Sequence, residues 1–343
     1  MATDHDGEGA QSDGRPMKIA IVGAGAIGGY LGAKLALAGE DVTLIARGPH
    51  LAAIQQYGLK LITPDGTEAT ATGARAMSDM AKAGQQDVVF LTLKTHSVPA
   101  VAPAMRALDG PDTMVVTMQN GIPWWYFRKH GGPYEGTRIE TVDPGGIVEA
   151  NTEIDRVIAS VVYPAAELAA PGVVRHIEGD RFSLGELDGV KTERIQMLAQ
   201  TLIRAGLKAP IRPRIRAEIW VKLWGNLAFN PISALTRATL VDICQYPPTR
   251  DLARTMMTEA QTIAEKLEIK FPISIEQRIA GAEEVGAHKT SMLQDIETGR
   301  PTEVDAIVGS VAELGRLTGT PTPAIDAIYA SVKLLEKTLR ADS

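Results

Sequence analysis

The sequence predicts an α/β fold in two parts, a doubly wound parallel sheet followed by an all-α domain. Three observations predict it. The chain has 343 residues, enough for two domains of about 150 residues each. Short apolar runs alternate with helical stretches up to about residue 210. Beyond Pro213, apolar residues recur only at helical spacing.

The first part contains short runs rich in Val, Ile and Leu. Their residues are apolar in succession, which is typical of parallel strands covered by helices on both faces. Such strands, separated by helical stretches, predict a Rossmann-type doubly wound sheet. The predicted strands span residues 18–22, 42–46, 87–93, 113–118 and 157–163.

The second part begins after the proline-containing stretch LKAPIRPR. We place the boundary within residues 206–214 and divide the chain into a sheet domain, residues 17–210, and a helical substrate or dimerisation domain, residues 211–343. Residues 1–16 are polar and glycine-containing, so they are predicted to be a disordered leader. The predicted helical stretches of the second part are 214–229, 251–268, 304–315 and 325–339.

Composition excludes several classes of function. A net charge of −6 provides no basic surface for nucleic acid or anionic lipid, and no apolar run approaches the roughly 18 residues of a membrane span. We therefore expect a cytoplasmic protein that binds neither nucleic acid nor membrane. The single Cys244 and six scattered histidines show no metal-ligand spacing, so no metal is expected.

The first predicted strand runs directly into the glycine motif GAGAIGG. Gly23 permits a tight turn, Gly25 allows the backbone to approach a pyrophosphate, and Gly28 allows the following helix to pack on the strand. The N-terminus of that helix supplies free N–H groups and a positive dipole to the diphosphate, and Ala26 and Ile27 of the motif are also predicted to bind the cofactor. Together with the flanking strands and helix, this spacing predicts a dinucleotide site.

The end of the second strand bears on the choice of dinucleotide. An NAD site would place Asp or Glu there, but the sequence reads Leu-Ile-Ala-Arg-Gly, with a cation at Arg47. Arg47 can bind a 2′-phosphate, which favours NADP; the alternative is a solvent-facing arginine that merely follows a strand.

Polar residues follow two further strands, where ligands of such sheets bind. Lys94 follows residues 87–93, and Asn120 follows residues 113–118. Either side chain can face a nicotinamide ribose or a substrate. Because Asn-Gly is also a favoured turn pair, a purely structural role of Asn120 stays open.

The stretch AEIWVKLWGNLAFNP, residues 217–231, predicts a buried helix because it is apolar nearly all round. Lys222, Asn226 and Asn230 recur every four residues and share one face. Buried polar groups need a partner, either internal or a ligand. A buried lysine with a lowered pKa is a suitable acid for a developing alkoxide, so we favour a functional role.

A second informative stretch covers residues 288–315. Glu303 lies in the first turn of a predicted helix, where a carboxylate is favourable for the helix dipole alone. It also borders the apolar stripe of that helix, which points it toward the interior or a cleft. Ser291 lies on the preceding predicted helix, within reach of a helical hairpin.

The glycine motif, Lys94, the Gln-Asn-Gly turn ending at Gly121, and the runs KLWGNLAFNPISAL and SMLQDIETGRPTEVDAIVG occur in an order that closely resembles the ketopantoate reductase (2-dehydropantoate 2-reductase) family. The resemblance spans Met17 to about Leu335. It implies a Rossmann-type domain, an all-helical domain, and a cleft between them that binds NADPH and a 2-oxo acid. The implied reaction is the reduction of ketopantoate to pantoate in pantothenate and coenzyme A biosynthesis.

The resemblance also assigns roles to individual residues. Lys222 resembles the catalytic lysine that protonates the carbonyl oxygen, and Glu303 the carboxylate that binds the substrate hydroxyl. Ser291 is similar to a ligand of the substrate carboxylate, and Asn226 and Asn230 to substrate-side amides. The remaining implied contacts are those of Asn120 with substrate and cofactor, Lys94 near the cofactor phosphate, and Arg47 at the 2′-phosphate.

One segment departs from the compact family pattern. Residues 119–146 are long and aromatic, with Trp124, Trp125, Tyr126 and Phe127 in succession. These side chains can reshape the substrate pocket, form a homodimer contact, or plug a long loop. Two other functions stay open: a D-2-hydroxy acid dehydrogenase acting on other branched or aromatic 2-oxo acids, and a non-catalytic NADP-binding sensor or scaffold.

Overall fold

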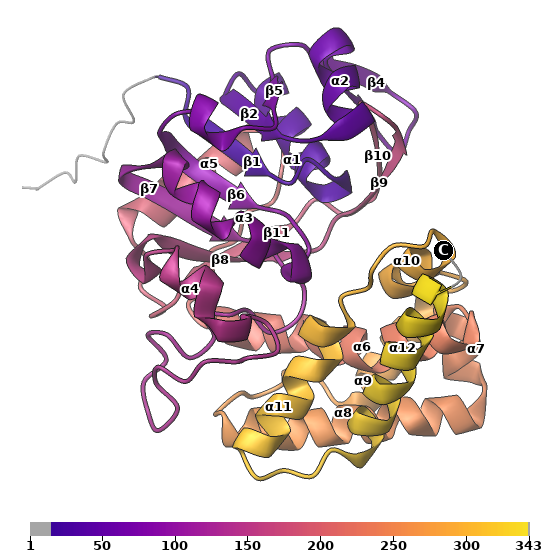
Figure 1. Ribbon diagram of the computed structural model, residues 1–343. Helices are drawn as coiled ribbons and strands as arrows, with labels where there is room; N and C mark the ends of the chain where they lie inside the picture. The colour runs from indigo at the N-terminus through magenta and orange to yellow at the C-terminus, as the bar shows by residue number, and fades with distance from the viewer. Residues whose placement is uncertain (1–14, 342–343) are drawn as a thin grey trace, which may run out of the picture.

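The computed structural model describes residues 15–341, and it forms a sheet-containing part and a helical part (Figure 1). Residues 1–14 of the predicted leader lie outside the described residues. Arg15, which follows them, forms an ion pair with Asp87 at 3.1 Å. The strands all belong to the first part, and the described chain after Ile215 is helical or irregular.

The main sheet has seven strands and confirms the predicted fold class. They are β1 (Lys18–Val22), β2 (Asp41–Ile45), β5 (Arg75–Met77), β6 (Gln86–Leu91), β7 (Asp109–Thr117), β8 (Val157–Val162) and β11 (Phe182–Glu186). Their order is β11-β8-β7-β6-β1-β2-β5, and all neighbouring pairs are parallel except β11 with β8. The order reverses at β1, so the carboxyl ends of β1 and β6 form the crevice where such sheets bind ligands.

Alternate residues of the central strands belong to two different apolar clusters. Ile19 and Ile21 pack with α1 (Ala26–Leu37) and α5 (Glu193–Arg204). Ala20 and Val22 belong to the cluster that contains α3 (Val98–Met105) and the C-terminal helices. The period of two along a strand therefore covers both sheet faces, which explains why the predicted strands are apolar throughout.

A second, four-stranded sheet was not predicted. It has the order β4-β3-β10-β9 and packs beside α1. Its strands are short or largely exposed and lack the continuous apolar runs that predicted the main sheet. They are β3 (Leu59–Ile62), β4 (Glu68–Ala71), β9 (Ala165–Ala170) and β10 (Val173–Glu178).

The C-terminal part is built around one long helix, α6 (Ile215–Thr236), which contacts α8, α10 and α12 as well as β8 and β11. Trp220 and Trp224 are almost fully buried, as the apolar sequence predicts. The helix continues past Pro231, beyond its predicted end at residue 229. The remaining helices are α7 (Leu240–Gln245), α8 (Pro247–Lys266), α9 (Ile275–Glu284), α10 (Ser291–Glu297), the π-helical turn η6 (Asp305–Gly309), α11 (Ser310–Leu317) and α12 (Pro323–Ala341).

The aromatic segment after Asn120 is part of the core. Trp125, Tyr126 and Phe127 are at most 1% exposed, and Trp124 is 7% exposed. Trp125 Nε1 donates to Thr117 Oγ1 at 2.8 Å, and Trp220 Nε1 donates to the Tyr126 hydroxyl at 2.7 Å. These side chains therefore belong to the core of this chain and are not exposed for a homodimer contact.

Candidate active site

The glycine turn between β1 and α1 has one crowded side and one open side. Gly23 adopts a φ of 105°, in the left-handed region that favours glycine. A Cβ on Gly28 would lie 2.2 Å from the Gly23 carbonyl oxygen and 2.5 Å from Thr92 Oγ1, so close helix packing requires glycine. A Cβ on Gly25 would meet no protein atom within 4 Å. The space above Gly25 is therefore open to a ligand.

This turn fits the diphosphate of a dinucleotide. Helix α1 begins at Ala26 and Ile27, and its N-cap, Gly25, offers no side chain to the free N–H groups of the first turn. Those groups and the helix dipole favour an anion, and the open space at Gly25 admits one close to the backbone.

Arg47 lies immediately beyond β2, at the N-cap of α2 (Gly48–Tyr57). Its side chain is exposed, and no ion pair is found between it and a carboxylate of residues 15–341. The guanidinium is therefore available to an external anion at the sheet edge where the glycine turn lies.

Lys222 of α6 reaches from the helical part to the sheet. Its Nζ donates to Asn120 Oδ1 at 2.7 Å and to the Val162 carbonyl oxygen at the end of β8. Asn120 Nδ2 in turn donates to Glu303 Oε2 at 3.0 Å. Three of the predicted site residues, drawn from both parts of the chain, thus form one hydrogen-bonded series.

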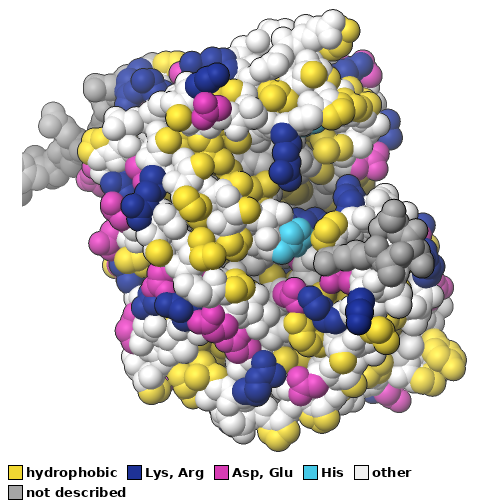
Figure 2. Space-filling view, viewed as in Figure 1, with side chains coloured by type: hydrophobic (Ala, Val, Ile, Leu, Met, Phe, Trp, Pro, Cys, Tyr) yellow, Lys and Arg dark blue, Asp and Glu magenta, His cyan; other side chains and the backbone are white. Residues whose placement is uncertain are grey.

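A pocket that is partly open to solvent lies beside this series. Asn120, Lys222 and Asn226 line it, together with Trp125 and Ser160. Ser160 is 7% exposed, and its hydroxyl has no hydrogen-bond partner within the described chain. On the face shown in Figure 2, the surface is hollowed between the two parts, and Lys and Arg side chains lie at the edge of the hollow.

Burial lowers the pKa of Lys222 from 10.5 to about 8, and the nearby Glu303 carboxylate opposes this effect. Desolvation disfavours the ammonium form, so the lysine releases its proton more readily than an exposed lysine does. An acid whose pKa lies close to the ambient pH is well suited to proton transfer. The direction of this shift is the one expected for Lys222 from the sequence, and its role as proton donor stays a prediction.

The Asn120 loop is held in place at both ends. Gln119 Nε2 donates to the carbonyl oxygens of Leu91 and Leu93, at 2.6 and 3.1 Å. Gly121 has a φ of 86°, and the next residue, Ile122, donates its N–H to the Ala306 carbonyl oxygen in η6 at 3.1 Å. The loop is therefore fixed between the end of β6 and a π-helical turn, a feature frequent at functional sites.

The other predicted residues lie outside the hydrogen-bonded series. Asn230 follows Asn226 by one turn but is buried and does not line the pocket. Ser291 is exposed at the first position of α10. Lys94 crosses to the helical part, where its Nζ donates to the Pro301 carbonyl oxygen at 2.9 Å and pairs with Asp295 at 2.6 Å.

Three residues close to Lys222 were not predicted from the sequence: Tyr163, and Glu218 and Arg181, which contact Tyr163. The Lys222 Nζ lies 5.9 Å from the centre of the Tyr163 ring, and the Tyr163 hydroxyl donates to Glu218 Oε1 at 2.9 Å. The guanidinium of Arg181 lies 3.8 Å from the same ring centre. Sequence signals existed, because Tyr163 ends a predicted strand and Glu218 precedes Lys222 by one helical turn.

The described residues contain neither a candidate metal site nor a candidate membrane-spanning helix. Residues 15–341 contain no group of three or more His, Cys, Asp or Glu side chains arranged to hold a metal ion. No described helix is both long enough and apolar enough to cross a membrane.

A glycine turn at the first strand of a Rossmann-type sheet, together with a half-buried lysine in a pocket between the two parts, is typical of an NAD(P)-dependent oxidoreductase. Residues 19–124 match the family model described as ketopantoate reductase PanE/ApbA, and residues 214–336 match the C-terminal model of ketopantoate reductase PanE/ApbA. The chain belongs to the ketopantoate reductase family.

Individual relatives are similar to this chain in sequence or in structure along nearly its whole length. The 2-dehydropantoate 2-reductase of Mesorhizobium japonicum is 58% identical over 320 residues, covering 93% of this chain and 98% of that protein. A solved structure from Ralstonia solanacearum, assigned as a ketopantoate reductase, has a TM-score of 0.90 at 42% identity and covers 94% of this chain and 98% of its own. D-mandelate dehydrogenase, solved with NADH and anilino(oxo)acetate, has a TM-score of 0.81 at 26% identity, with 94% and 99% covered.

Proposed function

We propose that this chain reduces ketopantoate to pantoate with NADPH, the reaction that serves pantothenate and coenzyme A synthesis. The observation that carries the proposal is the hydrogen-bonded series of Lys222, Asn120 and Glu303 beside the pocket. The 58% identity to a 2-dehydropantoate 2-reductase over almost the whole chain supports the choice of substrate.

In the proposed reaction, one hydride and one proton add across the carbonyl group of the 2-oxo acid. The reduced nicotinamide, when bound, supplies the hydride to C2. Lys222 donates a proton from Nζ to the carbonyl oxygen and stabilises the charge that develops there. Asn120 Oδ1 and the Val162 carbonyl oxygen accept hydrogen bonds from the same Nζ, which orients it before the transfer.

The carboxylate of Glu303 has two roles in this proposal. It accepts a hydrogen bond from Asn120, and its charge favours the protonated form of Lys222. The other carboxylate oxygen of Glu303, Oε1, is proposed to accept a hydrogen bond from the substrate hydroxyl. Ser291 and Asn226 are proposed to bind the rest of the substrate. Asn230, one helical turn after Asn226, is proposed to contribute to the same substrate site.

NADP is the proposed cofactor because of the residues at the end of β2. Arg47 is exposed there and no acid occupies the position that would bind both ribose hydroxyls. Gly23, Gly25, Ala26, Ile27 and Gly28 are proposed to hold the diphosphate, with Lys94 near it. The proposal includes a cytoplasmic location and a small 2-oxo acid as partner, and a homodimer stays a prediction.

A second candidate is a D-2-hydroxy acid dehydrogenase of the same architecture. The likeness to D-mandelate dehydrogenase favours it, as does the aromatic Trp125 in the pocket lining. Such a substrate has no hydroxyl group for Glu303, so the two candidates differ in their dependence on this residue.

Steady-state oxidation of NADPH and of NADH, with ketopantoate and a panel of branched and aromatic 2-oxo acids, tests the proposal. We expect NADPH-specific turnover that is fastest with ketopantoate. Turnover confined to bulkier acids would support the dehydrogenase. Binding of NADPH without turnover of any acid would refute both enzymes and support the sensor or scaffold.

A further inference from the structure

One arginine of the helical part, Arg278, packs close to the site and forms no ion pair with a carboxylate of residues 15–341. Arg278 lies on α9, and its guanidinium packs against Gly225 of α6. A Cβ built on Gly225 would lie 1.9 Å from Arg278 Nη2 and 2.6 Å from its Cζ. A side chain at position 225 would therefore displace the guanidinium from where it now packs.

Gly225 lies on the part of α6 that carries two pocket residues. Gly225 follows Lys222 by three residues, which places it on the neighbouring turn of the same side, and it precedes Asn226 directly. Lys222 and Asn226 both line the pocket. Arg278 is also close enough to the phenol of Tyr163 to interact with it electrostatically, and the Tyr163 ring faces Lys222.

The charge of Arg278 is not balanced by the described residues. None of their carboxylates forms an ion pair with it, and the titratable groups that act on it are the Cys244 thiol and the Tyr163 phenol. Burial raises the pKa of Cys244, and the pKa of Tyr163 is raised to about 12, so both groups are neutral at pH 7. Burial lowers the pKa of Arg278, yet a guanidinium stays charged at neutral pH.

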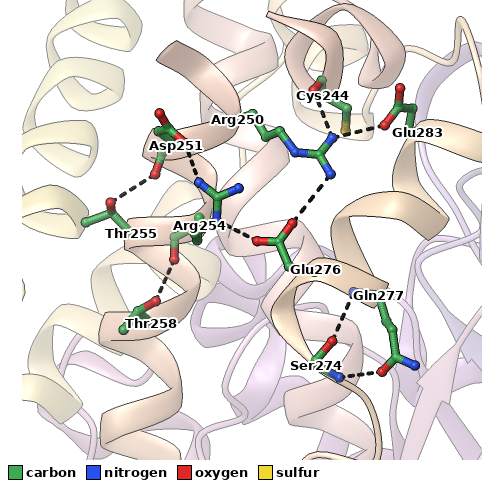
Figure 3. Close-up of polar contacts among 10 residues, drawn as sticks. All are labelled: Cys244, Arg250, Asp251, Arg254, Thr255, Thr258, Ser274, Glu276, Gln277 and Glu283. Atoms are coloured by element: carbon green, nitrogen blue, oxygen red, sulfur yellow. Dashed lines mark hydrogen bonds and ion pairs between the residues drawn. The ribbon is translucent and has the colours of Figure 1, made fainter. Parts of the chain in front are cut away.

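Two carboxylates on the same helix are bound elsewhere (Figure 3). Glu276 pairs with Arg254 at 2.5 Å and with Arg250 at 3.5 Å. Glu283 pairs with Arg250 at 3.0 Å. These pairs connect α9 to α8, so within the part of the chain that the structure describes neither carboxylate serves as a counter-ion of Arg278.

We propose that Arg278 binds the carboxylate of the 2-oxo acid substrate, an inference that rests on the proposed function. In a 2-oxo acid the carboxylate is bonded directly to the carbonyl carbon, so it must lie close to the group that protonates the carbonyl oxygen. The Arg278 guanidinium packs against Gly225, one helical turn from Lys222, and therefore meets this requirement. Its planar N–H groups match a carboxylate. A half-buried charge gains from a partner, and the substrate carboxylate is the proposed partner.

Kinetics of Arg278→Gln and Gly225→Ala test the proposal, the second because it displaces the guanidinium and keeps the charge. Both variants should raise KM for ketopantoate roughly 10- to 100-fold, the usual effect of a lost charged hydrogen bond. Both should leave kcat within about threefold and NADPH affinity unchanged. Arg316→Gln is the matched control, because that arginine is 67% exposed on α11.

A neutral substrate analogue separates binding from folding effects. The wild type should prefer the acid to the corresponding 2-oxo amide, and Arg278→Gln should lose that preference. Equal KM values and equal preference in Arg278→Gln and Arg316→Gln would overturn the proposal.

Binding measured without turnover separates this proposal from the assignment of ketopantoate. Titration of the protein–NADP⁺ complex with 2-oxoisovalerate, followed by tryptophan fluorescence, should show affinity that depends on Arg278. Such binding in a wild type inactive on ketopantoate would refute the substrate assignment and support the anion site. Binding that is the same in both variants and wild type would refute the anion site.

Discussion

Replacing Lys222 by Met removes the ammonium group and keeps a side chain of similar length. The pKa of Lys222 falls from 10.5 to about 8 on folding. At 1.36 kcal/mol per pKa unit, keeping this group charged in the folded protein costs roughly 3 kcal/mol. Loss of the hydrogen bonds to Asn120 and Val162 removes about 1 kcal/mol each, so the net gain in stability at pH 7 is about 1 kcal/mol.

The sign of the pH dependence follows from the direction of the shift. The folded protein binds the Lys222 proton less tightly than the unfolded chain does, so the free energy of unfolding of the wild type rises between about pH 8 and pH 10.5. The advantage of Lys222→Met should therefore shrink across that interval. Denaturant titrations of both proteins at pH 7 and above pH 10 measure it.

Whereas Lys222→Met should raise the stability at pH 7, it should lower the catalytic activity. Loss of a positioned general acid lowers kcat by roughly 10²- to 10⁴-fold, with NADPH affinity unchanged. In the wild type, kcat/KM for reduction should fall as pH rises through about 8, because the proton donor is lost. The assay is NADPH oxidation in the steady state across this pH range. A kcat within tenfold of wild type, or a Met variant less stable by several kcal/mol at pH 7, would refute the reasoning.

Four further substitutions have expected outcomes. Glu303→Gln keeps an acceptor for Asn120 but removes the charge that supports the Lys222 ammonium, so the fall in kcat/KM should move to lower pH; an unmoved profile contradicts this. Gly28→Ala should lower stability by about 1–3 kcal/mol in denaturant titrations, because its Cβ would contact the turn. Gly25→Ala should leave stability within about 0.5 kcal/mol and weaken NADPH binding at least tenfold, and unchanged affinity would mean that the diphosphate lies elsewhere. Arg47→Gln should weaken NADPH roughly 10- to 100-fold while NADH binding stays constant, and equal losses for both cofactors would contradict a 2′-phosphate contact.

The sequence predicted those features that depend on neighbouring residues. The five buried strands, the glycine turn and the helical face shared by Lys222 and Asn226 follow from local spacing, because each pattern fixes which side chains point the same way. The small second sheet was missed, because its strands are short or largely exposed and carry no continuous apolar run, and β3 pairs with the distant β10.

The tertiary structure alone decided which of these residues meet. Asn120 is 102 residues from Lys222 and 183 residues from Glu303, and no local pattern encodes such contacts. It also decided that the aromatic segment after Asn120 is buried in the core and that the Arg278 guanidinium packs against Gly225. The physical reason is that residue chemistry and helical faces are set locally, whereas burial, pKa and the partner of a charge depend on which elements pack together.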